Sequence, residues 1–372
     1  MSEQQERLTL ADRLTWSNSD PVGDDRRWRA TQFYNVPLLF QKPVAETYNT
    51  LYAKKGRREA NSYLRRTVRH FHEVNTQLAT DDDHATEYTK RRAADASRVA
   101  NKSEDPETQY KLLCKLTKSM KLNPPKPSKD VSLNGAIQRM QSERWIKQQL
   151  VRYHLQKFES AAIRAGMVHR FEGMYVSNEA LAAFQKRNAR HRRILNSIEL
   201  ENELGYRASL SDLAATSVSN PANRRHELMA RLYGFDQIAK EIGHCGLFVT
   251  LTCPSRMHAR YSKSGDPNPK YDGTSPSMAQ KYLCKLWANI RSKLKHGDIN
   301  IYGFRVVEPQ HDATPHWHIL LYTERTHEAL IKDIFTEQAL RDSPEEKGAD
   351  KRRCVFMDID WEKGSGVGYI AK

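Results

Sequence analysis

The sequence has 372 residues, with 60 Lys and Arg against 45 Asp and Glu, a formal net charge of +15 at pH 7. This length allows about two or three domains, and the excess positive charge favours a polyanionic partner, most simply nucleic acid. No stretch approaches the roughly 18 apolar residues of a membrane span, the polar first residues are not those of a signal peptide, and five scattered cysteines without a Cys-x-x-Cys pair are typical of a reducing cytosol.

The first two thirds of the chain are predicted to be mainly helical. Residues 1–50 show little periodicity, but beyond them apolar residues recur at the spacing of amphipathic helices. A run of aspartates from Asp81 is placed to start a helix, because carboxylates favour helix N-termini. The predicted helices cover residues 59–78, 87–100, 106–121, 134–165, 178–200 and 224–242.

A proline-rich segment, residues 123–128, predicts a boundary, because proline cannot continue a helix. The sequence pattern changes again at Gly243, where short runs rich in β-branched residues begin. We therefore predict three regions: a helical region 1–122, a helical and basic region 123–242, and a third domain 243–372. The basic region holds a cluster that either contacts a DNA backbone or forms a solvated helix face: Lys186, Arg187, Arg190, Arg192 and Arg193.

The third domain is predicted to have the order β–α–β–β–α–β, which is typical of a ferredoxin- or RRM-like antiparallel sheet with helices on one face. With the mainly helical N-terminal region, this makes the fold class α+β. Ser275 and Pro276 are expected to start the first of its helices, and Thr326 to cap the second. The predicted strands cover residues 245–253, 300–307, 316–322 and 354–360, and the second helix covers 326–340.

His316 and His318 are the candidates for a metal site. Side chains alternate along a strand, so both imidazoles leave the same face, roughly 6.6 Å apart at the backbone, and Trp317 faces the helices. Glu308 ends the preceding strand, and the connection returns it beside His316. His311 competes for the third ligand position but lies in the turn, so we favour Glu308.

The same spacing occurs at His70 and His72, where it predicts ordinary helix residues, because positions i and i+2 of a helix point about 200° apart. For His316 and His318 the alternative is a pair of ordinary sheet histidines. Two imidazoles and one carboxylate leave open coordination positions for a phosphate oxygen and water. Mg²⁺ or Mn²⁺ would suit phosphate chemistry, and Zn²⁺ would suit a hydrolase.

Three segments resemble the motifs of a known superfamily, in that superfamily's order: Phe248-Val-Thr-Leu-Thr, then Glu308 with Pro315-His-Trp-His-Ile-Leu, and last Gly368-Tyr-Ile-Ala-Lys. The chain resembles the HUH-superfamily rolling-circle replication endonucleases. Over residues 130–372 it is similar to their phage replication gene A protein branch, of the Peduovirus type, in which a segment like 224–235 precedes the first motif.

The resemblance implies an HUH endonuclease domain that nicks single-stranded origin DNA through a covalent 5′-phosphotyrosine intermediate, and so starts rolling-circle phage DNA replication. It implies Tyr369 as the nucleophile, and a divalent cation, Mg²⁺ or Mn²⁺, held by His316, His318 and Glu308. It also implies host helicase and polymerase as partners and the cytoplasm of the bacterial host as the location.

The chemistry of Tyr369 stands beside this resemblance. A phenol with a pKa near 10 is a poor nucleophile at neutral pH, so it needs a cation that polarises the phosphate. Lys372 shares a helix face with Tyr369 and would stabilise phenolate or phosphate; the alternatives are a surface lysine and a structural aromatic. Many family members carry a second tyrosine four residues after the first, so we expect a chain truncated in its tyrosine helix, with a frayed end and impaired activity.

Two other functions fit the same residues. One is a non-catalytic DNA-binding replication initiator with the same fold, and the other is a metal-dependent phosphodiesterase that uses water. A covalent protein–DNA adduct would distinguish the tyrosine nuclease from both.

Overall fold

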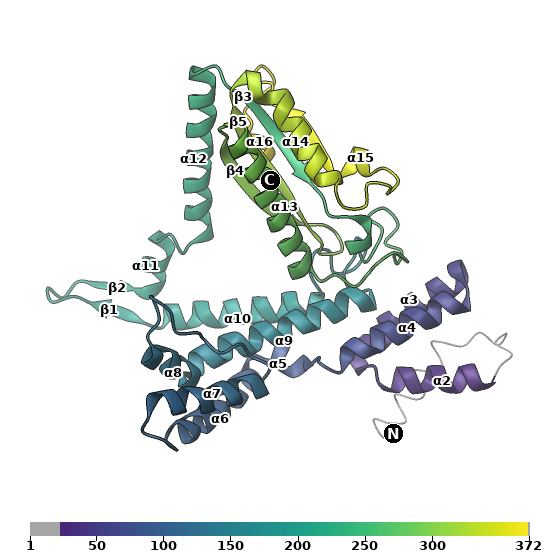
Figure 1. Ribbon diagram of the computed structural model, residues 1–372. Coiled ribbons are helices and arrows are strands. Elements are labelled where there is room, and N and C mark those ends of the chain that lie inside the picture. The colour runs from purple at the N-terminus through teal and green to yellow at the C-terminus, as the bar shows by residue number, and fades with distance from the viewer. Residues whose placement is uncertain (1–22, 371–372) are drawn as a thin grey trace. The chain divides into compact units, whose positions relative to one another are not determined.

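The computed structural model describes residues 23–370 (Figure 1). The chain divides into two compact units, of which unit 1 is Met1–Met167 with Val176–Arg187, and unit 2 is Val168–Tyr175 with Asn188–Lys372. The division falls inside the basic region expected at 123–242. The separation into three regions stays a prediction.

Unit 1 is helical, and its longest helix, α9, packs against five others, α3, α4, α5, α6 and α8. Its core contains a group of aromatic rings in which Phe40 lies 4.9 Å from Phe71 and 5.3 Å from Phe158. The helices are α2 Gly23–Tyr34, α3 Leu38–Lys55, α4 Arg57–Phe71, α5 Thr76–Thr80, α6 Asp82–Ala100, α7 Pro106–Ser119, α8 Leu133–Gln141, α9 Glu143–Ala165 and the first part of α10 Asn178–Asn196.

Two predicted helices of unit 1 are wrong as single elements, because each contains an N-cap residue that starts a new helix. The helix expected at 59–78 ends at Phe71, and Asn75 caps α5 by accepting a hydrogen bond from Leu78 N at 3.0 Å. The helix expected at 134–165 breaks at Ser142, whose hydroxyl accepts from Trp145 N at 3.4 Å. Side chains of Ser and Asn compete for backbone groups in this way.

The region before residue 59 is helical from Gly23 onward, which the weak periodicity did not indicate. The aspartate run does start a helix, as predicted. Asp81 accepts hydrogen bonds from Asp83 N and His84 N, both at 3.0 Å, so α6 begins at Asp82 instead of at 87. His70 lies in α4, as predicted, whereas His72 lies just beyond the helix, at its C-cap.

In unit 2, the last part of α10 is followed by a hairpin that was not predicted. The helix expected to reach residue 200 ends at Asn196, and residue 199 begins a strand. Each strand of the hairpin has three residues, and every residue of the first strand is exposed, so neither strand is long enough to show an alternating pattern that predicts a strand. The elements are β1 Glu199–Glu201, β2 Arg207–Ser209, α11 Leu210–Thr216 and α12 Pro221–Glu241.

A four-stranded antiparallel sheet forms the rest of unit 2, in the strand order β4-β5-β3-β6. Its elements follow the predicted chain order, with a helix after β3 and another after β5, so the α+β class is confirmed. Gly303 in β4 has φ +143, and a Cβ there would lie 2.0 Å from Leu320 O of β5, so only glycine allows this pairing. The elements are β3 Cys245–Leu251, α13 Pro276–His296, β4 Tyr302–Pro309, β5 Pro315–Thr323, α14 Glu328–Leu340, α15 Ala349–Arg352, β6 Cys354–Asp358 and α16 Val367–Ile370.

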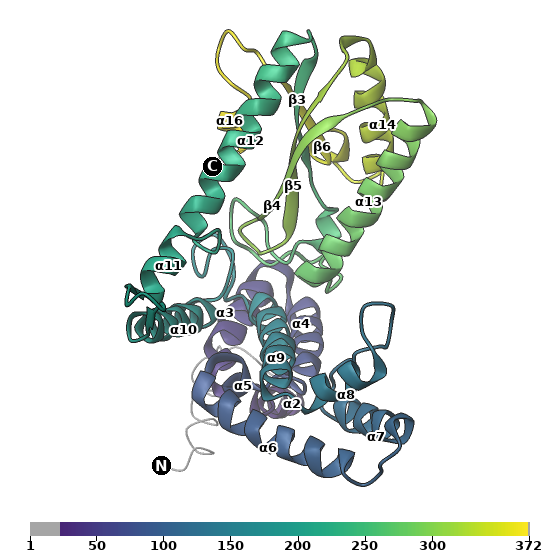
Figure 2. The same ribbon diagram turned by 90° about the vertical axis from the view of Figure 1, so that its left-hand side faces the viewer.

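Helices cover the two faces of this sheet differently (Figure 2). Helices α13 and α14 cover one face, where Trp317 is fully buried, as predicted, among apolar residues such as Leu283 and Phe335. On the opposite face, α12 and α16 enclose a smaller core around Leu320 and Tyr322. The part of this second face near Pro315 carries polar side chains.

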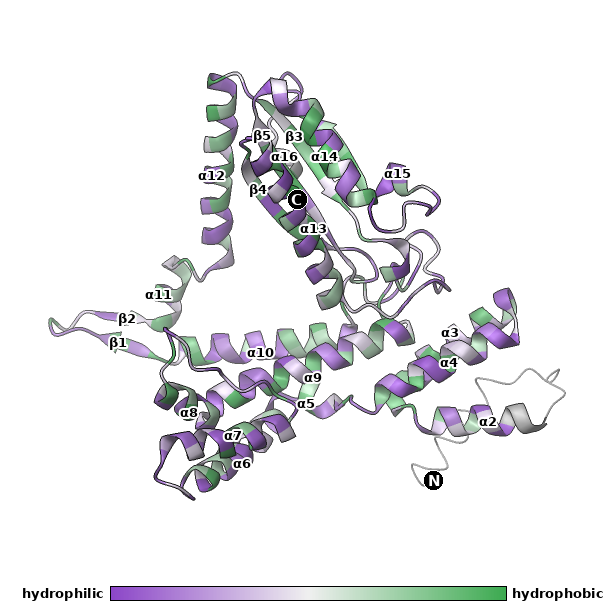
Figure 3. Ribbon diagram, viewed as in Figure 1, coloured by the Kyte–Doolittle hydropathy of each residue, from purple (hydrophilic) through white to green (hydrophobic). Residues whose placement is uncertain are grey.

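Ser275 caps α13 as predicted, through a hydrogen bond from Met278 N at 3.4 Å. The prediction that Thr326 caps α14 is wrong. Thr326 lies in a 3-10 turn, Arg325–His327, and α14 follows at Glu328 without a side-chain cap. Figure 3 shows hydrophobic residues gathered on α14 and the neighbouring strands, beside a hydrophilic loop at α15. Within residues 23–370, no helix is long and apolar enough to cross a membrane.

Candidate metal centre

The hairpin of β4 and β5 brings Glu308 opposite His316. Their Cα atoms are partners in the antiparallel register, one pair before the hairpin's last, Pro309 with Pro315. The connecting turn closes with a hydrogen bond from Gln310 N to Thr314 O at 2.8 Å. His318 lies two residues along β5, so its side chain leaves the same face as that of His316.

Glu308, His316 and His318 form a compact group whose ligand atoms lie within 4.8 Å of one another. One carboxylate oxygen, Glu308 Oε2, lies 3.6 Å from His316 Nε2 and 3.3 Å from His318 Nε2. Both imidazoles are about one-fifth exposed, and the carboxylate is more open, so the group is accessible from solvent. The structure therefore assembles all three residues that the sequence suggested.

Two further side chains fix the orientation of the histidine rings. Thr250 Oγ1 of β3 lies 3.0 Å from His318 Nδ1, and Gln310 Nε2 lies 3.1 Å from His316 Nδ1. Phe248 stacks on His318 with the ring planes 16° apart. With Nδ1 of each ring held, Nε2 is the nitrogen that turns toward Glu308. For Nε2 to bind a cation, Nδ1 must carry the proton, so the amide oxygen of Gln310 would then face His316.

The environment favours the neutral form of His316. Burial lowers the pKa of His316, the nearby His318 lowers it further, and Glu308 partly opposes both effects. A neutral imidazole is the form that ligates a metal. The same shift thus favours metal binding over protonation.

The arrangement fits a divalent cation. Two ligand atoms that bind one ion at about 2.1 Å lie at most about 4.2 Å apart, and both nitrogen–oxygen separations satisfy this limit. His316 Nε2 is buried and has no hydrogen-bond partner among the residues that the structure describes. A cation shared with Glu308 would satisfy this nitrogen.

The competing ligand, His311, is not part of the three-residue group found within residues 23–370. Its ring instead stacks on Tyr175, at 5.8 Å between centroids. Tyr369 lies in α16, but its side chain is outside the described part of the structure, and so is the whole of Lys372. The basic cluster on α10 is mostly exposed, so both of its interpretations stay open.

Helix α16 lies on the sheet face that carries the histidines, because its Val367 and Ile370 join the core of Leu320 and Tyr322. The segment that leads into α16 is held by the carboxylate of Asp236 on α12. Asp236 accepts hydrogen bonds, each of 2.9 Å, from the side chains of Tyr322, Trp361 and Ser365. Sequence analysis missed this role, since a lone aspartate in a helical pattern carries no signal.

Comparison with known proteins identifies the class. A sequence model described as bacteriophage replication gene A protein (GPA) matches residues 58–372. The chain therefore belongs to the bacteriophage replication gene A protein family.

Three relatives illustrate the family. The chain is 40% identical over 240 residues to the replication gene A protein of Escherichia phage 186, a match that covers 64% of this chain and 34% of that protein. It is 36% identical over 242 residues to a replication protein of Haemophilus phage HP1, covering 64% and 31%. It is 32% identical over 253 residues to a probable replication endonuclease from a prophage-like region of Salmonella typhi, covering 68% and 31%.

The chain spans about a third of the length of these relatives. No solved structure matches it significantly.

Proposed function

We propose that the chain is a metal-dependent endonuclease and strand transferase that nicks single-stranded DNA at a phage replication origin and starts rolling-circle replication. The observation that carries this proposal is the assembly of Glu308, His316 and His318 on the sheet face against which α16, with Tyr369, packs. The name of the Salmonella typhi relative, a probable replication endonuclease, supports nuclease chemistry.

The topology supports an HUH endonuclease domain with a ferredoxin- or RRM-like sheet. Two helical crossovers, α13 and α14, connect four antiparallel strands in the order β4-β5-β3-β6. The two histidines lie on a central strand, β5, and Thr250 of the first motif lies on its neighbour, β3. The first two motifs therefore share one sheet face, against which Val367 and Ile370 of α16 also pack.

In the proposed reaction, the Tyr369 hydroxyl attacks the scissile phosphorus and loses its proton to solvent. A bond forms between the tyrosine oxygen and phosphorus, and the bond from phosphorus to the 3′ oxygen breaks. The leaving oxygen takes up a proton and becomes a free 3′-OH. Mg²⁺ or Mn²⁺ held by Glu308, His316 and His318 would polarise the phosphate and offset charge on its oxygens.

The residues around the centre serve this chemistry in different ways. Thr250 and Gln310 hold the two imidazoles, so that both Nε2 atoms converge on one point. Tyr322, on the same face, is a poor candidate for the nucleophile, because burial and its hydrogen bond to Asp236 raise its pKa. We assign Lys372 to stabilising the phenolate or the phosphate.

The reaction exchanges one phosphodiester for another, so the same protein can rejoin strands without ATP. The free 3′-OH would serve host polymerase as a primer, with host helicase opening the duplex ahead of it. These steps place the protein's action in the cytoplasm of the bacterial host.

The test uses single-stranded oligonucleotides that tile the phage origin, incubated with the protein and Mn²⁺ or Mg²⁺ and resolved on a denaturing gel. A tyrosine nuclease gives a protein band shifted by covalently bound DNA, and Tyr369→Phe abolishes that band. Exposed Tyr206 provides a matched control, because Tyr206→Phe removes one hydroxyl far along the chain from α16 and should leave the adduct unchanged.

The other outcomes identify the alternatives. Nicking without an adduct would indicate a phosphodiesterase that uses water. If the protein binds the origin oligonucleotides but cleaves none of them, it would be a non-catalytic initiator. Either result would overturn the tyrosine mechanism.

A further inference from the structure

A cavity of about 170 Å³ lies in unit 2, beside the turn that connects β4 to β5. Its volume is similar to the roughly 150 Å³ of a cavity that accommodates benzene, so it admits one small group. Its walls come from the loop after β3, from the turn at Gln310 and from the segment 346–353.

The charged groups of the lining are unbalanced. Five are cationic, and two are acidic, Asp312 and Glu346. Asp312 already accepts hydrogen bonds from His258 Nδ1 at 3.2 Å and from Thr314 N at 3.1 Å. The cationic residues are Arg170, Arg260, Lys347, Arg352 and Arg353.

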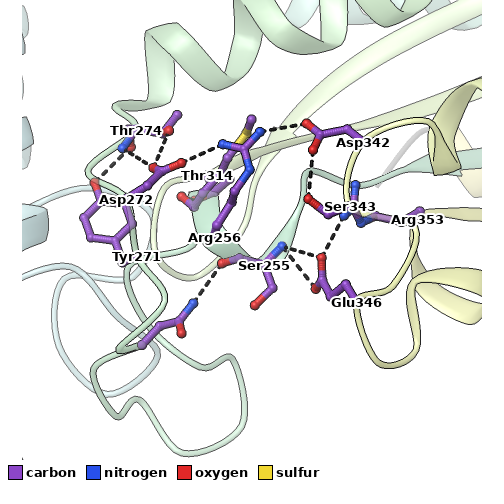
Figure 4. Close-up of polar contacts among 12 residues, drawn as sticks. Ser255, Arg256, Tyr271, Asp272, Thr274, Thr314, Asp342, Ser343, Glu346 and Arg353 are labelled. Atoms are coloured by element: carbon purple, nitrogen blue, oxygen red, sulfur yellow. Dashed lines mark hydrogen bonds and ion pairs between the residues drawn. The ribbon is translucent and has the colours of Figure 1, made fainter.

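Glu346 is engaged as well (Figure 4). Its carboxylate accepts from Arg353 Nη2 at 2.7 Å and from Ser255 N at 3.2 Å. Next to it, Arg256 donates hydrogen bonds to Asp272 at 2.6 Å and to Asp342 at 2.7 Å (Figure 4). These bonds connect the loop after β3 to the segment after α14. Both acids of the lining thus already accept hydrogen bonds from other groups, and the five cationic residues outnumber them.

Arg353 is the buried cation of the segment 346–353. Its side chain is 3% exposed, and its Nη2 donates to Glu346. Its Nε and Nη1 are buried, with no acceptor among residues 23–370. A buried guanidinium is stable when its N–H groups meet acceptors, and phosphate oxygens match this donor edge in pairs.

The cavity is linked to the candidate metal centre through Gln310. This side chain lines the cavity and also contacts His316 Nδ1 at 3.1 Å. A DNA strand with one phosphate at the metal centre therefore carries a neighbouring phosphate toward this cavity.

We propose that the cavity binds a phosphate group of the single DNA strand next to the scissile phosphate, with Arg353 as its buried donor and Arg352 at its mouth. This inference rests on the proposed function for the position of the strand. The bound phosphate would fix which linkage reaches the metal centre.

The experiment measures binding in EDTA, so that cleavage plays no part. A fluorescent oligothymidylate is titrated with the protein at several salt concentrations, using anisotropy. Arg352→Gln and Arg353→Gln should each weaken binding about 5- to 10-fold, and each should reduce the slope of log K against log salt by about 0.7, the value for one phosphate contact to a single strand. Lys285→Gln, at an exposed position of α13, removes the same charge and should change affinity less than about twofold.

Arg352 is exposed, so its variant tests the proposal even if Arg353→Gln fails to fold, and thermal unfolding checks both proteins. Arg353→Lys keeps the charge and should recover part of the affinity. Unchanged affinity and salt slope in folded Arg352→Gln and Arg353→Gln would overturn the proposal. The proposal would also be overturned if inorganic phosphate bound only to the wild-type protein while oligothymidylate bound all variants equally. The cavity would then be a site for free phosphate and not for a DNA strand. A missing protein–DNA adduct in the cleavage assay would refute the tyrosine mechanism without affecting these results.

Discussion

The two faces of strand β5 show how one short segment serves both stability and chemistry. Trp317 faces α13 and α14 and is completely buried, while His316 and His318, its neighbours in sequence, are about one-fifth exposed on the other face. The covered face is filled by apolar contacts, and the open face keeps polar atoms within reach of a ligand. Substitutions one residue apart should therefore alter different properties of the protein.

The largest expected effect is on the open face. His316→Ala and His318→Ala should each reduce metal-dependent cleavage to background, because each removes one of three candidate ligands. DNA binding should keep its affinity and salt dependence, since these come from Lys and Arg. Gel assays of cleavage and anisotropy in EDTA measure the two properties separately. Normal cleavage by both variants would refute the metal centre.

The opposite result is expected one residue away. Trp317→Ala should lower the free energy of unfolding by about 3–5 kcal/mol, because it leaves a cavity in the core. It also removes the hydrogen bond from Trp317 Nε1 to Gln280 Oε1, of 2.9 Å. Urea unfolding measures the loss, and His318→Ala is the matched control, expected to change stability by less than about 1 kcal/mol. Equal losses in both would contradict the division between the faces.

A smaller effect is expected from the residues that orient the histidines. Thr250→Val and Gln310→Leu should each weaken Mn²⁺ binding by about 10- to 100-fold, because the ring that each one holds becomes free to turn. Calorimetric titration with Mn²⁺ measures this change. Thr250→Ser keeps the hydroxyl and should bind Mn²⁺ like wild type; a loss in that variant would assign the effect to packing.

The smallest effect concerns pH and Asp312. Burial would raise the pKa of Asp312, but hydrogen bonds from His258 and Thr314 more than offset it and hold the pKa below the usual 3.8. The ionised carboxylate thus stabilises the fold above about pH 3.8, and this contribution is lost as the pH falls through the lower folded-state pKa.

Asp312→Asn should therefore lower the free energy of unfolding by about 1–2 kcal/mol at neutral pH. The difference from wild type should shrink as the pH falls below about 3.8. Urea unfolding across this pH range tests the sign. A difference that grows in acid would contradict it.

The sequence predicted the elements whose signals are local. Strands β3 to β6 are short β-branched runs, and the histidine pair followed from alternation along a strand. The position of Glu308 beside His316 was predicted from the length of the turn that connects β4 to β5. These inferences need only the geometry of one hairpin.

Other parts depend on contacts between distant segments. Neither Thr250 nor Gln310 differs in sequence from an ordinary strand or turn residue, and only pairing of β3 with β5 brings Thr250 to His318. The breaks at Asn75 and Ser142 were missed because apolar spacing continues across each cap. Arg353 similarly resembles a surface arginine until its burial against Glu346 is seen.

The hydrogen bonds of Asp236 also limit how the four-stranded sheet of unit 2 can be cut out or transplanted. A fragment that begins at β3 would lose the acceptor for Tyr322, Trp361 and Ser365, and would uncover the apolar core that α12 shares with α16. The smallest portable unit of the sheet therefore includes α12, which ends more than a hundred residues before α16, the helix with which it shares this core.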